Sequence, residues 1–262
     1  MNYADLAAPI EAAMRATRER ALEAFASDRG GTMWKPDGSA LTELDTDLEA
    51  QLSEVLLDID PTFGLRGEEA GWVREGNPTW YLDPVDGTSN FARRLTLFGS
   101  QLVLVDGIDP LFAAVYEPLA DIFTWAAKGA GCWHQGKKVE TPDRAPKDAI
   151  VTFDISAKGL FGDHPELPGT IRKGCYKVRA FGSIAIQLRD VAIGASDGYV
   201  GGRPTTSHLH DMAPGALMIR EAGGLFTDGQ GQDALIERKR IIAASPQVHD
   251  WLCTVVPPPN PA

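Results

Sequence analysis

The chain has 262 residues, with 25 Lys plus Arg against 36 Asp plus Glu, and its formal net charge is −11. This length allows a large core in one or two domains, and the lack of any basic run argues against nucleic acid as a main partner. No apolar run approaches the ~18 residues of a membrane span, and the N-terminus lacks the layout of a signal peptide, which predicts a cytoplasmic protein without membrane contact.

The N-terminal half is predicted to be α+β. A first helix is predicted, and residues 28–31 are expected to end it. The residues that fall on one face of this helix are Leu6, Ile10, Met14, Thr17, Ala21 and Phe25. A second helix is predicted from Leu44 to Ile59, with Thr42 and Asp45 as a capping box at its start. Strand-like runs follow, separated by turn residues that favour antiparallel pairing, at 80–82, 101–105, 111–116 and 122–125.

The C-terminal half is predicted to be α/β. A polar, proline-containing stretch at 141–147 is typical of a boundary, so we expect subdomains of residues 1–144 and 145–262. Beyond it, helical patterns at 184–191 and 212–219 alternate with strands predicted at 150–153, 178–181, 198–200, 225–227 and 240–244. The proline-rich tail at 257–261 is predicted to be extended and disordered.

The three cysteines, Cys132, Cys175 and Cys253, lie far apart and lack CxxC spacing. This spacing argues against a disulfide framework and against a thiolate zinc site. We therefore expect buried, reduced thiols.

The stretch DPVDGT at residues 83–88 is the strongest candidate for chemistry. Asp83 follows an apolar strand predicted to end at Leu82, and the proline fixes the backbone and orients the Val85 carbonyl. Two carboxylates and a carbonyl suit a hard cation such as Mg²⁺ or Mn²⁺. The glycine lets the chain approach an anion, which the amides at the start of a short helix could bind. From these residues alone, a turn without catalytic function is the alternative.

Further acidic residues surround this stretch in the sequence. Glu68 and Glu69 lie in a turn before it, while Asp45 and Asp211 stand in the first turns of predicted helices. Each one alone is explained by a solvated loop or by the helix dipole. A metal cluster that draws on scattered carboxylates explains them together.

Together these residues resemble the inositol monophosphatase family, within the magnesium-dependent, lithium-sensitive phosphatase superfamily. The family pattern is an Asp, then Glu-Glu, then Asp-Pro-Ile/Leu-Asp-Gly-Thr/Ser, then Trp-Asp and a later Gly-Gly. Here the same order appears as Asp45, Glu68-Glu69, the stretch at 83–88, His210-Asp211 and Gly223-Gly224. The agreement in order and spacing extends over nearly the whole chain.

The resemblance implies a layered αβαβα fold of the sugar-phosphatase type and assigns functions to matching positions. Two or three Mg²⁺ ions, with Mn²⁺ as a possible substitute, would be held by Glu68, Asp83, the Val85 carbonyl, Asp86 and Asp211. Asp45 and Thr88 would orient the attacking water, with Glu68 as its base. Substrate would be bound by the amides of Gly87 and Thr88 and by Ser183, Arg203 and His210. Relatives are commonly homodimers, which implies a homodimer here.

Two positions depart from the family pattern. His210, within His208-Leu209-His210-Asp211, replaces the usual Trp. A zinc site is the less favoured interpretation, since the rest of a zinc signature is missing, and we expect His210 to pack beside the metal site or to contact substrate. Gly201 stands near the place where an inositol-selective relative would carry a Glu that reaches the sugar hydroxyls. Selectivity for inositol is therefore not expected.

The sequence thus predicts a Mg²⁺-dependent phosphomonoesterase that acts on a small polyol, sugar or related phosphate. No GxSxG motif supports a side-chain nucleophile, so attack by water is expected. Histidinol-phosphate phosphatase, fructose-1,6-bisphosphatase and 3′-phosphonucleotide phosphatase remain alternatives. A catalytically inactive binding or regulatory protein on the same fold is an alternative from another class.

Overall fold

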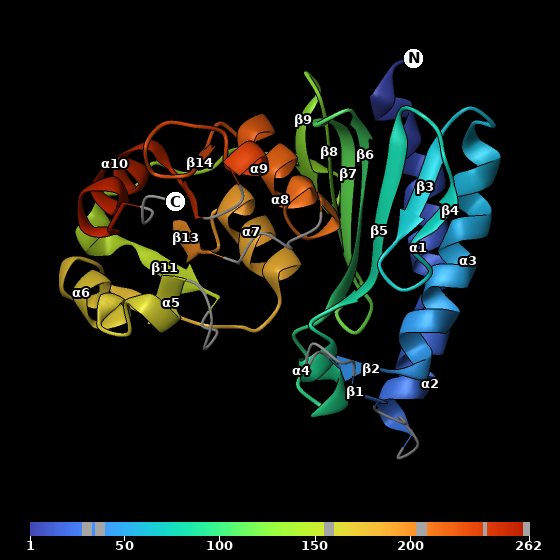
Figure 1. Ribbon diagram of the computed structural model, residues 1–262, viewed down its shortest axis with the longest axis horizontal. Coiled ribbons are helices and arrows are strands. Elements are labelled where there is room, and N and C mark those ends of the chain that lie inside the picture. The colour runs from blue at the N-terminus through green and yellow to red at the C-terminus, as the bar shows by residue number, and fades with distance from the viewer. Residues whose placement is uncertain (28–32, 35–39, 155–159, 203–208, 238–239, 259–262) are drawn as a thin grey trace.

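The computed structural model describes residues 1–27, 33–34, 40–154, 160–202, 209–237 and 240–258. Their helices and strands form five layers, in which two sheets alternate with three layers of helices (Figure 1). The predicted αβαβα layering, with an α+β half followed by an α/β half, is confirmed.

The first layer consists of N-terminal helices. They are η1 (Tyr3–Leu6), α1 (Ala7–Ala16), α2 (Arg18–Ala26) and α3 (Glu43–Ile59). The predicted first helix is divided at Thr17, whose amide and hydroxyl both donate to the Met14 carbonyl, at 3.2 and 2.7 Å. Its predicted end at 28–31 lies outside the described residues. The capping box of α3 is confirmed, because the Thr42 amide donates to Asp45 Oδ2 at 2.8 Å.

The second layer is an eight-stranded sheet with the order β10-β9-β8-β7-β6-β5-β3-β4 among the described residues. Its strands are β3 (Gly64–Gly67), β4 (Trp72–Arg74), β5 (Thr79–Asp86), β6 (Gly99–Asp106), β7 (Asp109–Glu117), β8 (Ile122–Ala127), β9 (Gly131–His134) and β10 (Lys137–Val139). Its pairs are antiparallel except β3–β5, which is parallel. The four predicted strands lie within β5 to β8. The strands that were not predicted have only three or four residues, too few to show a period of two.

Strand β5 does not end at Leu82, as the sequence suggested, but continues to Asp86. Its pairing with β6 shifts register between Asp83 and Asp86, because Pro84 has no N–H to give to the ladder. Asp83, Val85 and Asp86 therefore lie on an irregular strand end rather than on a loop.

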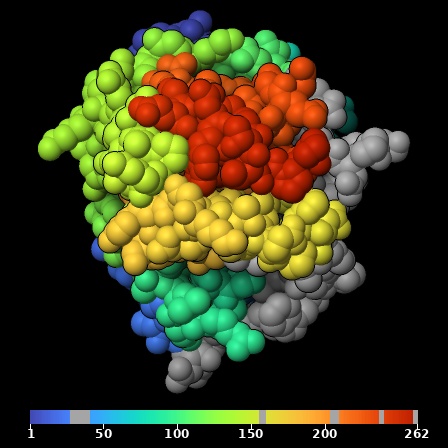
Figure 2. All heavy atoms as spheres, turned by 90° about the vertical axis from the view of Figure 1, so that its left-hand side faces the viewer, coloured from blue at the N-terminus to red at the C-terminus, as the bar shows by residue number. Residues whose placement is uncertain are grey.

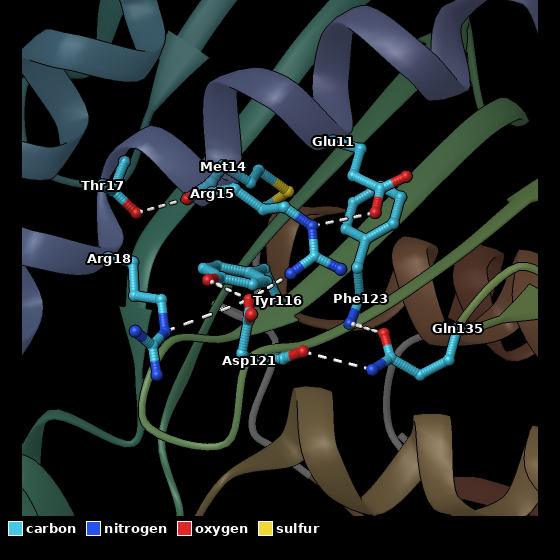
Figure 3. A network of polar contacts seen from close by, with 9 residues as sticks. All are labelled: Glu11, Met14, Arg15, Thr17, Arg18, Tyr116, Asp121, Phe123 and Gln135. Carbon is cyan, nitrogen blue, oxygen red and sulfur yellow. Dashed lines mark hydrogen bonds and ion pairs between the residues drawn. The ribbon is translucent and has the colours of Figure 1, made fainter.

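A polar network ties α1 to the turn between β7 and β8 (Figure 3). Arg15 forms ion pairs with Asp121 and with Glu11, whose Oε1 lies 2.9 Å from Arg15 Nε. The Tyr116 hydroxyl donates to Asp121 Oδ1 at 2.8 Å, and the Gln135 amide donates to the Asp121 carbonyl at 3.2 Å. These contacts fix the first helical layer on the sheet.

The third layer lies between the two sheets. It contains α7 (Ile184–Ile193) and α8 (Leu209–Glu221), which form one apolar core with side chains of both sheets, such as Val115 and Tyr199. Every residue of α8 from Leu209 to Ile219 is buried. A helix that is buried all round is expected for a layer covered by a sheet on each side.

The second sheet has the order β12-β11-β13-β15-β14 in the described part of the chain. Its strands are β11 (Ile150–Phe153), β12 (Lys177–Arg179), β13 (Gly198–Gly201), β14 (Leu225–Thr227) and β15 (Ile241–Ala244). β11 pairs in parallel with β12 and β13, whereas β15 pairs antiparallel with β13 and β14. All five predicted strands are found, within two residues of their predicted bounds.

The fifth layer covers the outer face of the second sheet with α5 (Leu160–Asp163), α6 (Leu167–Gly174) and α10 (Pro246–Val255). Figure 2 views this face, with α10 in red above the yellow α5 and α6. The remaining elements of the described chain are α4 (Thr88–Ala92), η2 (Pro146–Asp148), α9 (Ala234–Glu237) and the pair β1 (Met33–Trp34) and β2 (Ala40–Leu41). Most of the predicted tail, from residue 259 on, lies outside the described residues.

The subdomain boundary at 144 stays a prediction. The strands of the two sheets fall on either side of it, but α7 and α8 also pack against β6 and β7. Cys132 and Cys175 are buried, Cys253 is half-buried, and all three are free thiols. None of the helices in the described part of the chain has the length and apolar character that a membrane crossing requires.

Candidate active site

A cavity of about 160 Å³ lies where the irregular end of β5 meets the end of β11 and the first turns of α7 and α8. It brings together most of the predicted site. Its lining residues are Glu68, Asp83, Val85, Asp86, Gly87, Thr88, Ser89, Asp154, Gly182, Ile184 and Asp211.

Glu68 reaches the cavity because β3 runs parallel to β5. Gly67 pairs with Leu82, and the Glu68 amide donates to the Leu82 carbonyl at 2.9 Å, so Glu68 follows its strand beside Asp83. The turn is held by Glu49, a buried residue of α3. Its two carboxylate oxygens accept the amides of Glu69 at 2.9 Å and Ala70 at 2.7 Å.

Gly67 leaves the space that this contact needs, since a Cβ there would lie 2.4 Å from Glu49 Cδ. Glu49 thus positions the turn that carries Glu68. Sequence reasoning missed it, although its spacing of four residues from Asp45 places both on one face of α3.

We expect Glu49→Gln to lower the free energy of unfolding by about 1–3 kcal/mol, because the new NH₂ group would face one of two N–H donors. Hydrogen exchange of the Glu69 and Ala70 amides should become faster. Chemical denaturation and exchange measurements check both effects. The matched control is Glu54→Gln, at an exposed position of the same helix. Equal behaviour of the two variants would contradict a positioning function for Glu49.

Asp83 is the most deeply buried carboxylate of the cavity wall, with 2% of its surface exposed. Its Oδ1 accepts the Val85 amide at 3.0 Å, and its Oδ2 accepts the Gln101 side-chain amide at 3.2 Å. Burial raises the pKa of Asp83 well above its usual value, and the charges of Glu68, Asp86 and Asp211 raise it further. The site therefore concentrates negative charge that a bound cation would offset.

Asp86 joins the end of β5 to the start of α7. Its Oδ2 accepts hydrogen bonds from the Ser183 hydroxyl and from the Ala185 amide, the latter at 2.8 Å. Ser183 is the N-cap of α7 and also accepts the Ile186 amide at 3.3 Å. The positive end of the helix dipole thus lies against Asp86. Ser183 is buried and its predicted contact with substrate stays a prediction.

Gly87 begins the short helix α4 (Thr88–Ala92) in the left-handed conformation, with φ of 90°. A Cβ there would lie 3.0 Å from the Leu97 carbonyl oxygen, so glycine fits both the backbone angle and the space. The first amides of a helix have no acceptor within it. Those of Thr88 and Ser89 border the cavity and are suited to an anion.

Asp45 is buried beside the cavity and contacts Thr88. The Thr88 hydroxyl lies 3.3 Å from Asp45 Oδ1 and 2.9 Å from the Val85 carbonyl oxygen. Burial raises the pKa of Asp45, and its hydrogen bonds from the Thr42 hydroxyl and amide oppose this effect. The capping box that starts α3 thus also fixes the carboxylate on which Thr88 depends.

The last predicted region is only partly described. Asp211 lines the cavity from the first turn of α8. His210 is buried, with its Nε2 atom 3.6 Å from Asp211 Oδ1, and it does not line the cavity. Its predicted contact with substrate stays a prediction. Arg203 and His208 lie outside the described residues.

The oxygen donors around the cavity fit a hard cation. They comprise the carboxylates of Glu68, Asp83, Asp86, Asp154 and Asp211 and the backbone carbonyl of Val85, and no Lys or Arg occurs among the described residues of the wall. Such a set suits Mg²⁺ or Mn²⁺ better than zinc. No three His, Cys, Asp or Glu side chains of the described chain already surround a common metal position.

Two further residues of the site gave no clear signal in the sequence. Asp154 lines the cavity from the end of β11, and its position depends on how the two sheets pack. Asn90 braces the wall, because its side-chain amide donates to the Leu97 and Phe181 carbonyls at 2.7 and 2.6 Å. An isolated Asp after a strand and an Asn in a short helix are ordinary turn residues by pattern.

Comparison with known proteins gives matches over nearly the whole chain. The model of the inositol monophosphatase family matches residues 3–258. A fructose-1,6-bisphosphatase/inositol-1-monophosphatase of Thermotoga maritima is 26% identical over 220 residues, covering 82% of each chain. The Nus factor SuhB of Escherichia coli is 29% identical over 222 residues, covering 82% of this chain and 81% of that protein. The crystal structure of extragenic suppressor protein suhB from Bartonella henselae shares the fold, with a TM-score of 0.89, 23% identity and coverage of 96% and 98%.

Proposed function

Because the chain belongs to the inositol monophosphatase family, we propose that it is a Mg²⁺-dependent phosphomonoesterase that acts on a small polyol, sugar or related phosphate. The observation that carries this proposal is that Glu68, Asp83, Asp86, Thr88 and Asp211 line the same cavity. A protein that had lost catalysis would retain these crowded carboxylates at a cost, with no cation to offset them.

The metal would be held by Glu68, Asp83, the Val85 carbonyl, Asp86 and Asp211. Two or three Mg²⁺ ions, or Mn²⁺ in their place, would neutralise phosphate charge, lower the pKa of water and stabilise the leaving alkoxide. The chain itself supplies the positions of these oxygens, since Asp83 and Asp86 are each fixed by two hydrogen bonds.

The remaining steps depend on side chains and amides of the wall. Asp45 and Thr88 orient the attacking water, and the Glu68 carboxylate accepts its proton. The amides of Gly87 and Thr88 bind the phosphate oxygens at the start of α4. The described wall contains no Ser–His or Cys–His pair, which supports direct attack by water in line with the leaving group.

Gly201, at the end of β13, supports a leaving group other than inositol. A Cβ at Gly201 would lie 2.4 Å from the Tyr199 hydroxyl oxygen, so the Tyr199 ring fills the space of a side chain there. The carboxylate with which an inositol-selective relative would hold the sugar hydroxyls is therefore missing. A sugar phosphate, histidinol phosphate or a nucleotide-derived phosphate fits the proposal better.

A panel of phosphate esters tests the function and the substrate preference. We expect Mg²⁺-dependent phosphate release, with a higher kcat/KM for at least one of histidinol phosphate, fructose 1,6-bisphosphate and a 3′-phosphonucleotide than for myo-inositol 1-phosphate. Phosphate release with and without Mg²⁺ is the measurement. A strong preference for myo-inositol 1-phosphate over every other ester would refute the argument from Gly201.

A non-catalytic function is the second candidate, and the relative named a Nus factor is the observation that favours it. A lack of phosphate release from every ester would favour this candidate.

The phosphatase proposal also includes localisation and partners. The protein is proposed to be a cytoplasmic homodimer that binds a small-molecule phosphate ester and neither nucleic acid nor membrane. Sedimentation of the purified protein tests the dimer.

A further inference from the structure

We propose that Gln101 is a positioning residue that fixes the Asp83 carboxylate and thereby makes the candidate metal site selective for Mg²⁺ over Ca²⁺. This inference rests on the proposed phosphatase function and concerns the same cavity. Gln101 does not line the cavity and is not one of the proposed metal ligands.

Gln101 lies directly beside Asp83 in the eight-stranded sheet. Strand β6 runs between β5 and β7 (Figure 1), and within it Gln101 pairs with Asp83 on β5 and with Val115 on β7. Residues that pair across antiparallel strands point to the same face of the sheet, and Val115 belongs to the core that α7 and α8 form. The Gln101 side chain is therefore enclosed between the sheet and the third layer, with an exposed fraction of 0%.

The side-chain amide of Gln101 completes the hydrogen bonds of Asp83. Gln101 Nε2 lies 3.2 Å from Asp83 Oδ2, whereas the Val85 amide nitrogen lies 3.0 Å from Asp83 Oδ1. The opposite orientation of the Gln101 amide would turn its oxygen towards the carboxylate, so that two acceptors would face each other. With one donor on each oxygen, the Asp83 carboxylate cannot rotate without losing a hydrogen bond.

The other end of the same amide indicates that packing alone does not account for Gln101. Its Oε1 atom is buried and has no hydrogen-bond partner in the described part of the chain. A buried acceptor without a partner destabilises the folded state, and an apolar side chain of similar shape would avoid that cost. The contact with Asp83 is what glutamine adds over such an apolar side chain.

A fixed carboxylate favours the ion with the stricter geometry. Mg²⁺ requires a near-octahedral set of oxygens at about 2.0–2.1 Å, whereas Ca²⁺ accepts six to eight oxygens in a flexible arrangement at about 2.3–2.6 Å. Loss of the Gln101 contact would let the Asp83 carboxylate rotate, and Mg²⁺ would lose more binding than Ca²⁺. Gln101 therefore determines which ion is bound as well as how tightly it is bound.

Calorimetric titration of the metal-free protein with Mg²⁺ and with Ca²⁺ tests this inference without an activity assay. Gln101→Met keeps the length of the side chain and removes the donor. We expect it to raise the Kd for Mg²⁺ about 10- to 100-fold, the range for loss of a group that orients a metal ligand. The Kd for Ca²⁺ should rise less than about threefold, because Ca²⁺ tolerates a less ordered site. Gln101→Asn, whose amide is one methylene shorter, should show the same difference.

Thr124→Val is the matched control for removal of a buried polar group. Thr124 is as buried as Gln101 and pairs with Val115 from the other side, so it lies in the same row across the sheet. Its hydroxyl oxygen lies 2.8 Å from His134 Nδ1, and no hydrogen bond joins it to Asp83. Both dissociation constants should stay unchanged in this variant, even where its melting temperature is lower.

Three outcomes would overturn this inference and leave the phosphatase proposal intact. They are an unchanged Kd for Mg²⁺ in the Gln101 variants, an equal rise for Mg²⁺ and Ca²⁺, and the same rise in Thr124→Val. A wild-type protein that neither binds Mg²⁺ nor releases phosphate from any ester would overturn the proposed function and this inference together.

Discussion

Asp86→Asn is expected to lower phosphatase activity by roughly two to three orders of magnitude, the range for loss of one preorganised electrostatic group. The asparagine can keep its oxygen on the Ser183 hydroxyl and the Ala185 amide, so the fold should be retained. Its NH₂ group would then replace Oδ1, and NH₂ does not bind Mg²⁺. Phosphate release and calorimetric titration with Mg²⁺ measure the two effects.

Removal of the metal should reproduce this loss in the wild-type protein. EDTA should abolish activity, and added Mg²⁺ should restore it. The control for Asp86→Asn is Asp163→Asn, which removes an exposed carboxylate on α5 and should leave activity unchanged. Full turnover in EDTA, or wild-type activity of Asp86→Asn, would refute the metal-dependent assignment.

The parts of the site that could be predicted from the sequence are those encoded over short distances. The capping box of Thr42 and Asp45 and the stretch at 83–88 are local patterns. The capping box occurs in the structure as predicted, whereas the stretch at 83–88 borders the cavity from a strand end that the sequence did not predict. The predicted end of β5 was wrong, because a proline such as Pro84 usually indicates the end of a strand. In this structure Pro84 lies in a bulge next to β6.

Residues that depend on packing between distant segments could not be predicted. Glu49 looks like a polar residue on the outside of a helix, and its partner amides lie 20 and 21 residues along the chain. Asp154 meets the residues of β5 only because α7 and α8 hold the two sheets together. In both cases the local sequence is compatible with an ordinary surface residue, and tertiary structure decides its environment.

The Thr88→Ala variant should lower kcat by roughly 10²- to 10⁴-fold, with a smaller effect on KM, because Thr88 is proposed to position a proton transfer rather than to bind substrate through its side chain. Its hydroxyl has a single proton and two acceptors, Asp45 Oδ1 at 3.3 Å and the Val85 carbonyl at 2.9 Å. When that proton is donated to Asp45, the hydroxyl lone pairs can accept a hydrogen bond from water in the cavity, which orients the water for transfer of its proton to Glu68. Steady-state kinetics with the best ester of the panel measures the effect.

Thr88→Ser separates the hydroxyl from the rest of the side chain. The serine keeps the donor and should retain most of kcat, whereas Thr88→Val keeps the shape and should behave like Thr88→Ala. Direct attack by the water that Thr88 orients also fixes the stereochemistry, since a single in-line displacement inverts a chiral thiophosphate. Retention of configuration would indicate a covalent phosphoenzyme, and it would refute water attack even if all Thr88 variants behaved as expected. Inversion together with an unaffected Thr88→Val variant would instead remove Thr88 from the mechanism and leave Asp45 and Glu68 to orient the water.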